Sequence, residues 1–327
     1  MSESTRNPEA ERPHADTSYR YVVAVYAAVL LAGAIFFAAQ PATTGALSFH
    51  FYLLMWIALA AGVNVMAGFT GYVAFGYVAC FGIGAYSTAI LTTKVGLPIG
   101  VALCGTLLVG ILASLAFSRI LSLRGIYFSM VTLAIAVICR ALISMVPSDI
   151  AGGAHGLSLV STMSPTMAYF SMLGLALLAI GISFWIRLSR FGMYLAAIRD
   201  DMEAAQVAGL NIKRLRLYAW MISAAIGSLA GGIEAWYSSV IDLESGFNLL
   251  ISTKAIIFAA FGGVGTVIGP VVGAMTMYSV DNYIWERFPS LNNLALGVTI
   301  VALMVFFPKG IIGSITQRWQ RLRKWLW

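Results

Sequence analysis

Ionisable residues lie within several long apolar runs of the chain, where burying a charge is costly. Among them are Arg140, Glu234 and Lys254. An ionisable side chain inside a membrane-spanning segment is by default a functional candidate. Each of these three is expected near the external end of its apolar run, which favours snorkelling to the interface or mutual pairing over a substrate gate. Their roles stay open on sequence alone.

No catalytic or metal-binding pattern accompanies these charges. The three histidines are isolated, and no group of Cys, His and acidic residues has the spacing of metal ligands. Cys80, Cys104 and Cys139 lie within apolar runs, match no paired spacing and are interpreted as packing residues. The phosphate-binding pattern Gly-x-x-x-x-Gly-Lys-[Ser/Thr] is absent. The sequence therefore predicts no catalytic group, no metal, no bound cofactor and no ATP hydrolysis by this chain.

The longest polar interruption of the apolar pattern runs from Arg187 to Arg216. Acidic residues near a helix N-terminus interact favourably with the helix dipole, and a glycine commonly ends a helix. A short helix is therefore expected in this loop, ended by Gly209 and built from Asp200, Glu203, Ala204, Ala205 and Ala208. An ordinary solvated loop is the alternative. We prefer a cytoplasmic helix pair that offers charged and small side chains to a partner protein.

Glycines interrupt the apolar pattern at two further places. Gly68, Gly71 and Gly76 lie at the boundary between two apolar runs, too many glycines for an undisturbed helix. A tight turn with close helix packing and a broken helix beside a translocation path both fit, because irregular backbone at membrane depth is tolerated where it is buried or lines a water-filled cavity. Sequence alone does not separate these alternatives.

The second glycine-rich segment follows Phe261 and contains Gly262, Gly263, Gly265, Gly269 and Gly273. The last three lie four residues apart, which predicts a ridge of small residues where helices approach closely. Pro270 is expected to kink or restart the helix, because proline donates no backbone hydrogen bond.

The charged residues, the loop and the glycine-rich segments lie within or between apolar runs of about 20 residues, the length that a helix needs to cross a membrane. Of the 327 residues, 60% are hydrophobic and only 10% are charged, whereas soluble domains carry roughly 25% charged residues. The fold class is therefore all-α: a polytopic membrane protein of about ten transmembrane helices with broken or glycine-rich segments. The spans are expected near residues 21–39, 48–66, 72–93, 97–117, 126–146, 166–187, 216–237, 250–266, 270–285 and 292–308.

Charge distribution predicts the orientation of these spans. Basic residues gather in alternate connections and near both ends, which favours a cytoplasmic location for both termini and an even number of spans. The net charge of +7 is explained by this topology, and nucleic acid is not expected as a partner. The expected domains are a disordered cytoplasmic tail at 1–20, a transmembrane domain at 21–312 with a cytoplasmic loop at 187–216, and a basic cytoplasmic tail at 313–327.

The motifs resemble, in order, those of the permease subunits of ABC importers for branched-chain amino acids. The matching blocks are the two glycine-rich segments, the loop Ser189–Asn211, and the segments Phe81–Tyr86, Arg124–Leu133 and Phe307–Gly310. The resemblance covers about residues 45 to 312. Its most specific part is the loop signature Ser-Arg-Phe-Gly, Ala-Ile-Arg-Asp-Asp-Met-Glu-Ala-Ala and Gly-Leu-Asn.

The resemblance implies that the loop docks into a cytoplasmic ATP-binding subunit. The residues that match the loop core are Arg199, Asp200, Glu203, Ala204, Ala205 and Gly209. Asp200 and Asp201 stand where relatives commonly have Glu-Asp, a change that keeps the charge. The implied partners are a second related permease, two ATPase subunits that hold ATP and Mg²⁺, an external solute-binding protein and the lipid bilayer of the bacterial plasma membrane.

Three other functions are weighed against this one. The resemblance also fits an importer of another small solute, such as urea or short amides. An ion-coupled secondary transporter usually needs ionisable groups near the bilayer midplane, and the mid-span positions here are nearly bare of charge. An intramembrane enzyme lacks a nucleophile with its base, or a metal site. The importer is therefore expected to translocate branched-chain or related hydrophobic amino acids, and the chain is not expected to be an enzyme.

Overall fold

The computed structural model describes residues 32–39, 47–153, 156–159 and 164–287, together with residues 294, 297, 298, 301 and 310. It divides into two compact units, Met1–Gly45 and Ala46–Trp327. In the first unit the described residues 32–39 are helical. The tails predicted at 1–20 and 313–327 lie outside the described residues, as do most of the spans predicted at 21–39 and 292–308.

Six apolar stretches in the described part of the second unit are long enough to cross a membrane. They are α2 (Leu47–Thr70), α4 (Ile99–Ala116), α5 (Ile126–Ser144), α7 (Pro165–Leu188), α10 (Ile212–Ser238) and the stretch Leu243–Gly262, which comprises α11 (Leu243–Gly246) and α12 (Leu249–Gly262). The all-α membrane fold is thereby confirmed. The count of ten spans stays a prediction.

The described part of the second unit contains further elements. They are α3 (Tyr77–Thr93), η1 (Ser118–Ser122), α6 (Ser148–Ala151), β1 (Leu157–Ser158), α8 (Arg190–Asp200), α9 (Met202–Val207), β2 (Val240–Ile241) and α13 (Gly269–Arg287). The 17 residues of α3 rise about 26 Å at 1.5 Å per residue, less than the roughly 30 Å of a bilayer core. Because α3 is short and mostly buried, it is surrounded by other helices over most of its length.

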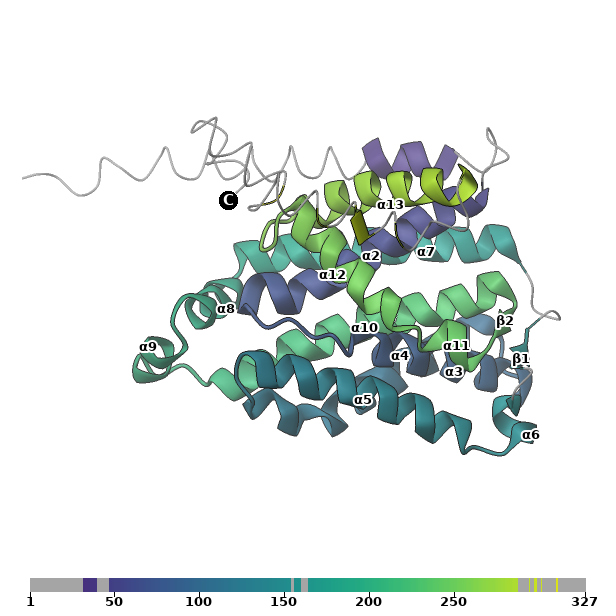
Figure 1. Ribbon diagram of the computed structural model, residues 1–327, viewed down its shortest axis with the longest axis horizontal. Helices are drawn as coiled ribbons and strands as arrows, with labels where there is room; N and C mark the ends of the chain where they lie inside the picture. The colour runs from purple at the N-terminus through teal and green to yellow at the C-terminus, as the bar shows by residue number, and fades with distance from the viewer. Residues whose placement is uncertain are drawn as a thin grey trace, which may run out of the picture. The chain divides into compact units, whose positions relative to one another are not determined.

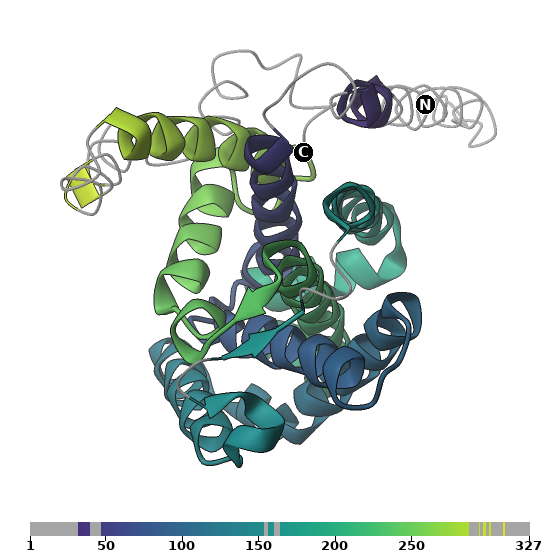
Figure 2. The ribbon, with the colours of Figure 1, turned by 90° about the vertical axis from the view of Figure 1, so that its right-hand side faces the viewer.

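The core of the second unit forms around α2. Nearly every residue of α2 after Tyr52 is buried, and α3, α7, α10, α12 and α13 pack against it or against each other (Figure 2). Helices α4 and α5 lie at the outside and expose most of their apolar surface. Cys80 and Cys139 are buried as packing residues, whereas Cys104 on α4 is exposed. A helix that is apolar and exposed on its outer face suits contact with lipid.

The two ends of the helical bundle carry different structures (Figure 1). At one end α8 and α9 project as a pair between α7 and α10. At the other end β1 and β2 form a two-stranded antiparallel sheet in which Leu157 pairs with Ile241 and Ser158 with Val240. This small sheet ties the connection before α7 to the connection after α10.

Candidate functional site: the α8–α9 pair and two helix breaks

The first helix break separates α2 from α3. Gly71 has φ of +78°, a conformation that residues with a side chain disfavour, and α2 ends just before it. Gly76 immediately precedes α3, and a Cβ there would overlap the carbonyl group of Thr132 in α5. The span expected from residue 72 therefore begins only at Tyr77, because these glycines turn the chain and bring it against α5.

The second break separates α12 from α13. Gly263 and Gly265 have φ of +124° and +82°, so the span expected at 250–266 stops at Gly262. Pro270 is the second residue of α13 and restarts the helix, where its missing N–H has no intrahelical partner to lose. Both glycine-rich segments are therefore true interruptions between helices.

The predicted ridge of three glycines is wrong for Gly265. A Cβ on Gly273 would overlap the carbonyl oxygen of Phe258, and one on Gly262 would overlap that of Gly269. These three glycines bring the backbones of α12 and α13 together. Gly265, in contrast, lies in the break, and a Cβ on it would meet the carbonyl oxygen of Gly68 at 3.1 Å. Its backbone therefore lies against Gly68 of α2.

A buried asparagine joins the two breaks. The Nδ2 of Asn64 in α2 donates to the carbonyl oxygen of Thr266 at 2.9 Å, and its Oδ1 accepts from the backbone N–H of Gly265 at 2.8 Å. Asn64 is fully buried. Segments about 200 residues apart in sequence are thus held by one amide. The sequence offered one signal for this contact, a polar amide inside an apolar run. Such residues commonly form hydrogen bonds between membrane helices.

Arg199 connects this pair of breaks to α8. Its Nη1 donates to the carbonyl oxygen of Gly68 at 3.0 Å, one of the last four carbonyls of α2 that no intrahelical N–H can satisfy. A Cβ on Gly71 would meet Arg199 Cγ at 3.1 Å, and one on Gly265 would meet its Nη1 at 2.7 Å. Glycines at both breaks therefore make room for this side chain. A cation at a helix C-terminus is also favoured by the helix dipole.

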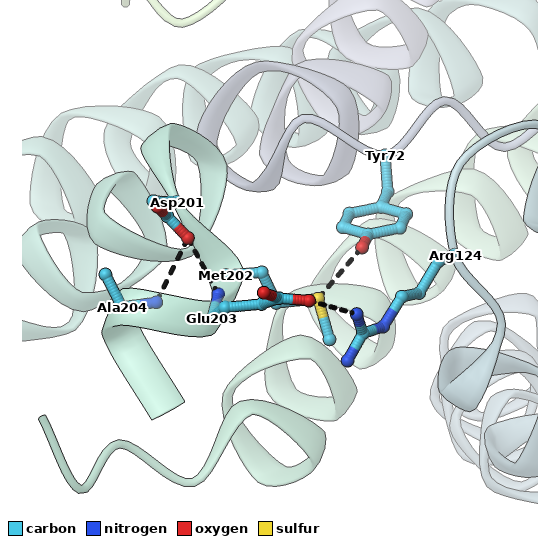
Figure 3. A network of polar contacts seen from close by, with 6 residues as sticks. All are labelled: Tyr72, Arg124, Asp201, Met202, Glu203 and Ala204. Carbon is cyan, nitrogen blue, oxygen red and sulfur yellow. Dashed lines mark hydrogen bonds and ion pairs between the residues drawn. The ribbon is translucent and has the colours of Figure 1, made fainter. Parts of the chain in front are cut away.

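The short helix expected in the loop is α9, and Asp201 caps it (Figure 3). Asp201 Oδ1 accepts from the backbone N–H groups of Glu203 and Ala204 at 2.9 and 3.0 Å. Gly209 follows the helix with φ of +85°, as expected of a residue that ends it. Asp200, in contrast, is the last residue of α8 and lies 3.5 Å from Arg199 Nε.

Met202 and Glu203 at the start of α9 each contact a residue far away in the sequence (Figure 3). Glu203 Oε1 lies 3.1 Å from Arg124 Nη1, and both side chains are largely exposed. The hydroxyl of Tyr72, in the first break, lies 3.1 Å from the sulfur of Met202. Glu203 therefore forms an ion pair with Arg124 of the same chain. The sequence did not predict this pairing.

The faces of α9 differ in what they offer. Ala205 is buried with Ile198 and Ile212, so it packs inward and is not presented to a partner. Ala204 is exposed and Val207 is 90% exposed. An apolar side chain at the tip of the projecting helix pair is available to another protein.

Arg216 is a further residue whose role the sequence did not reveal. It was expected in the basic flank of the loop, but it is fully buried. Its Nη1 and Nη2 both donate to the carbonyl oxygen of Leu123 at 3.3 Å, and its guanidinium lies 3.6 Å from the centre of the Tyr72 ring. Arg216 thus connects α10, the first break and the segment after η1. The arginine–ring contact adds a cation–π attraction.

The family follows from comparison with known sequences. Residues 45–307 match the family described as the permease component of the branched-chain amino acid transport system. The chain belongs to this family. The match covers both helix breaks and the α8–α9 pair, so the resemblance stated from the motifs is confirmed.

Individual relatives agree with this membership. The chain is 28% identical over 293 residues to the high-affinity branched-chain amino acid permease LivM of Escherichia coli, covering 79% of this chain and 68% of the relative. It is 29% identical over 143 residues to LivH of the same organism, covering 42% and 44%. The autoinducer 2 import permease LsrC of Yersinia enterocolitica is 25% identical over 158 residues, covering 45% and 43%. No solved structure matches. The chain is therefore a multi-pass transport permease and not an enzyme.

Proposed function

We propose that this chain is the permease half of an ATP-driven importer for branched-chain or related apolar amino acids. The supporting observation is the position of Arg199, which links the projecting α8–α9 pair to the first break directly and lies against Gly265 of the second. A displacement of α8–α9 by a partner would act on both breaks at once. The breaks are therefore the parts of the membrane domain that ATP-driven motion would move.

The partners in this proposal are two cytoplasmic ATPase subunits, a second permease and an external binding protein. The chain is similar to both LivM and LivH of Escherichia coli, which supports pairing with a related permease. Exposed Ala204 and Val207 form the surface offered to an ATPase subunit. ATP and Mg²⁺ are held by those subunits.

Orientation belongs to the same proposal. The α8–α9 pair and both termini lie in the cytoplasm of a bacterial inner membrane, as the basic flanks favour. A Val207→Cys variant tests this in a Cys104→Ser background, because Cys104 is exposed. An impermeant maleimide added to right-side-out vesicles should leave the introduced cysteine unlabelled, and inside-out vesicles should give full labelling. Labelling from the outside contradicts the proposed orientation.

The docking surface is tested by Val207→Asp. The variant should insert normally and lose its ATPase subunits during purification, because a carboxylate placed in a desolvated interface has no partner there. The matched control is Val240→Asp, since Val240 is also exposed but lies in β2 at the other end of the bundle. Equal retention of the ATPase subunits in both variants argues against docking on α9.

Two alternatives remain distinguishable by transport. The similarity to an autoinducer 2 import permease favours, as second candidate, an importer of another small polar solute. Uptake assays with leucine and with other solutes in proteoliposomes separate these substrates. Uptake that continues without ATP and stops with an ionophore would instead identify an ion-coupled transporter.

A further inference from the structure

A cleft at the end of the bundle opposite α8–α9 has the properties of a small-molecule site. Its volume is about 730 Å³, within the roughly 300–1,000 Å³ typical of such sites. It is lined by the first half of α2, by α12, by the second half of α13 and by Glu234 of α10. Figure 2, viewed from this end, shows α12 and α13 in green and yellow-green beside the purple α2.

The walls of the cleft are mainly aromatic and apolar. Tyr52, Met55 and Trp56 of α2 face it, together with Tyr278 and Trp285 of α13. Such walls accommodate an alkyl or aromatic group by burying its surface, and aromatic faces also attract an ammonium group.

Charges in the cleft are unevenly paired. Lys254 Nζ lies 2.7 Å from Asp281 Oδ2, with both side chains mostly buried. Glu286 Oε1 accepts from Asn282 Nδ2 at 2.7 Å. Among the described residues, no hydrogen bond or ion pair involves the carboxylate of Glu234. A partly buried carboxylate without a partner is costly, and a bound cation would remove that cost.

The ion pair between Lys254 and Asp281 is the second polar feature of the cleft, after Glu234. Asp281 Oδ1 is buried without a hydrogen-bond partner among the described residues, and a lysine ammonium has three donors, of which this pair uses one. Among the described residues, the cleft therefore contains one carboxyl group without a partner and one cation with donors to spare, between apolar walls. Mutual pairing of Lys254 with Glu234, one of the options left open by the sequence, does not occur.

We infer that this cleft binds a small apolar compound that carries an ammonium group, with the ammonium on Glu234 and the alkyl part against Trp56 and Met55. A carboxylate on the same compound would accept from Lys254. The inference deepens the proposed function, on which it rests, because it places the solute's polar ends on named residues of this chain.

Protection of a cysteine in the cleft tests this inference. Leu250 lines the cleft and is 45% exposed, so Leu250→Cys in the Cys104→Ser background reports occupancy through its rate of maleimide labelling. The full-length chain, with its partner subunits, is placed in phosphatidylglycerol nanodiscs, whose lipid has no ammonium group. The probes are leucine, leucinamide and 4-methylpentanoate, which lacks the ammonium.

Leucine and leucinamide should slow labelling, and 4-methylpentanoate should not. Glu234→Gln should weaken this protection about tenfold or more, since an ion pair is removed. Glu286→Gln is the matched control and should keep the protection, because Glu286 already has Asn282 as partner. Two results would overturn the inference. One is slower labelling in phosphatidylethanolamine nanodiscs without protection by any of the soluble compounds. The other is protection by leucine in Glu234→Gln that equals the protection in the parent protein.

The outcome separates the cleft from the proposed function. If Glu234→Gln does not change the protection but ATP-driven leucine uptake is intact, the proposed binding in the cleft is wrong and the importer function stands. If the protection depends on Glu234 but uptake does not depend on ATP, the ATP-driven importer function is wrong and the proposed binding in the cleft stands.

Discussion

Arg199 donates a hydrogen bond to the carbonyl oxygen of Gly68, a residue 131 positions earlier in the chain, at 3.0 Å. The contact joins the last turn of a projecting helix to the last turn of a buried one. This hydrogen bond joins α8 to α2 alongside the apolar packing of Leu195 in the same buried cluster as Phe69.

Arg199→Ala should uncouple ATP hydrolysis from transport. The loss of one partly exposed hydrogen bond costs only about 1 kcal/mol of stability, so the protein should still fold and bind its ATPase subunits. The ratio of solute imported to ATP hydrolysed in proteoliposomes should fall several-fold. Arg190→Ala is the control, because Arg190 is exposed at the start of α8. An unchanged ratio in Arg199→Ala rules out this role.

Asn64→Leu should destabilise the membrane domain. The substitution leaves the N–H of Gly265 and the carbonyl of Thr266 without the partner that Asn64 gives them, at a cost of about 1–3 kcal/mol. The midpoint of thermal unfolding in detergent should fall accordingly. Asn282→Ala removes a bond between neighbouring turns of one helix and should change the midpoint little. Equal midpoints for the two variants would show that Asn64 does not hold the breaks together.

Gly273→Ala should disturb the contact between α12 and α13. The added Cβ overlaps the carbonyl oxygen of Phe258, and forced overpacking typically costs about 1–3 kcal/mol. Gly181→Ala provides the comparison, because a Cβ there meets nothing within 4 Å. We expect reduced yield and a lower unfolding midpoint for the first variant and no such change for the second. Tolerance of both would mean that the helices separate easily.

Glu203→Lys should release the ATPase subunits while leaving membrane insertion intact. Its pair with Arg124 is largely exposed and contributes at most about 1 kcal/mol, so stability should change little. The exchange Arg124→Glu with Glu203→Lys restores an internal pair. We expect this exchange not to restore ATPase retention in pull-down assays, since position 203 would still present the wrong charge to the partner. Full recovery in the exchange variant assigns the effect to the internal pair instead.

Asp242 should contribute a pH-dependent part of the stability at the other end of the bundle. The backbone N–H and the hydroxyl of Ser245 hold the pKa of this carboxyl below its usual range. A lowered pKa stabilises the fold above the unfolded-state value of about 3.9, and this contribution is lost as the pH falls through the folded-state pKa. Asp242→Asn, which cannot titrate, should flatten the change in unfolding midpoint between pH 6 and pH 3. A change as steep as in the parent protein contradicts this assignment.

The sequence by itself determined the class of the protein and most of its helices. Apolar runs predict helices because a backbone in lipid must satisfy its hydrogen bonds within the same segment, and eight of the predicted runs correspond to helices of the structure. Clustered glycines and Pro270 marked the two segments where the helices are interrupted, although the sequence left open a turn or a broken helix at the first, and the loop signature indicated the permease family. These features are encoded by neighbouring residues.

Only the tertiary structure decided which distant groups meet. The α2 sequence is apolar on nearly all sides, so it does not specify which face contacts Gly265, Arg199 or α10. The buried positions of Arg216 and Asn64, the pairing of Lys254 with Asp281 and the position of Glu234 in the cleft all depend on how helices pack. Helix periodicity reports local hydrogen bonding, whereas these contacts depend on crossing angles and on the close approach that glycines allow.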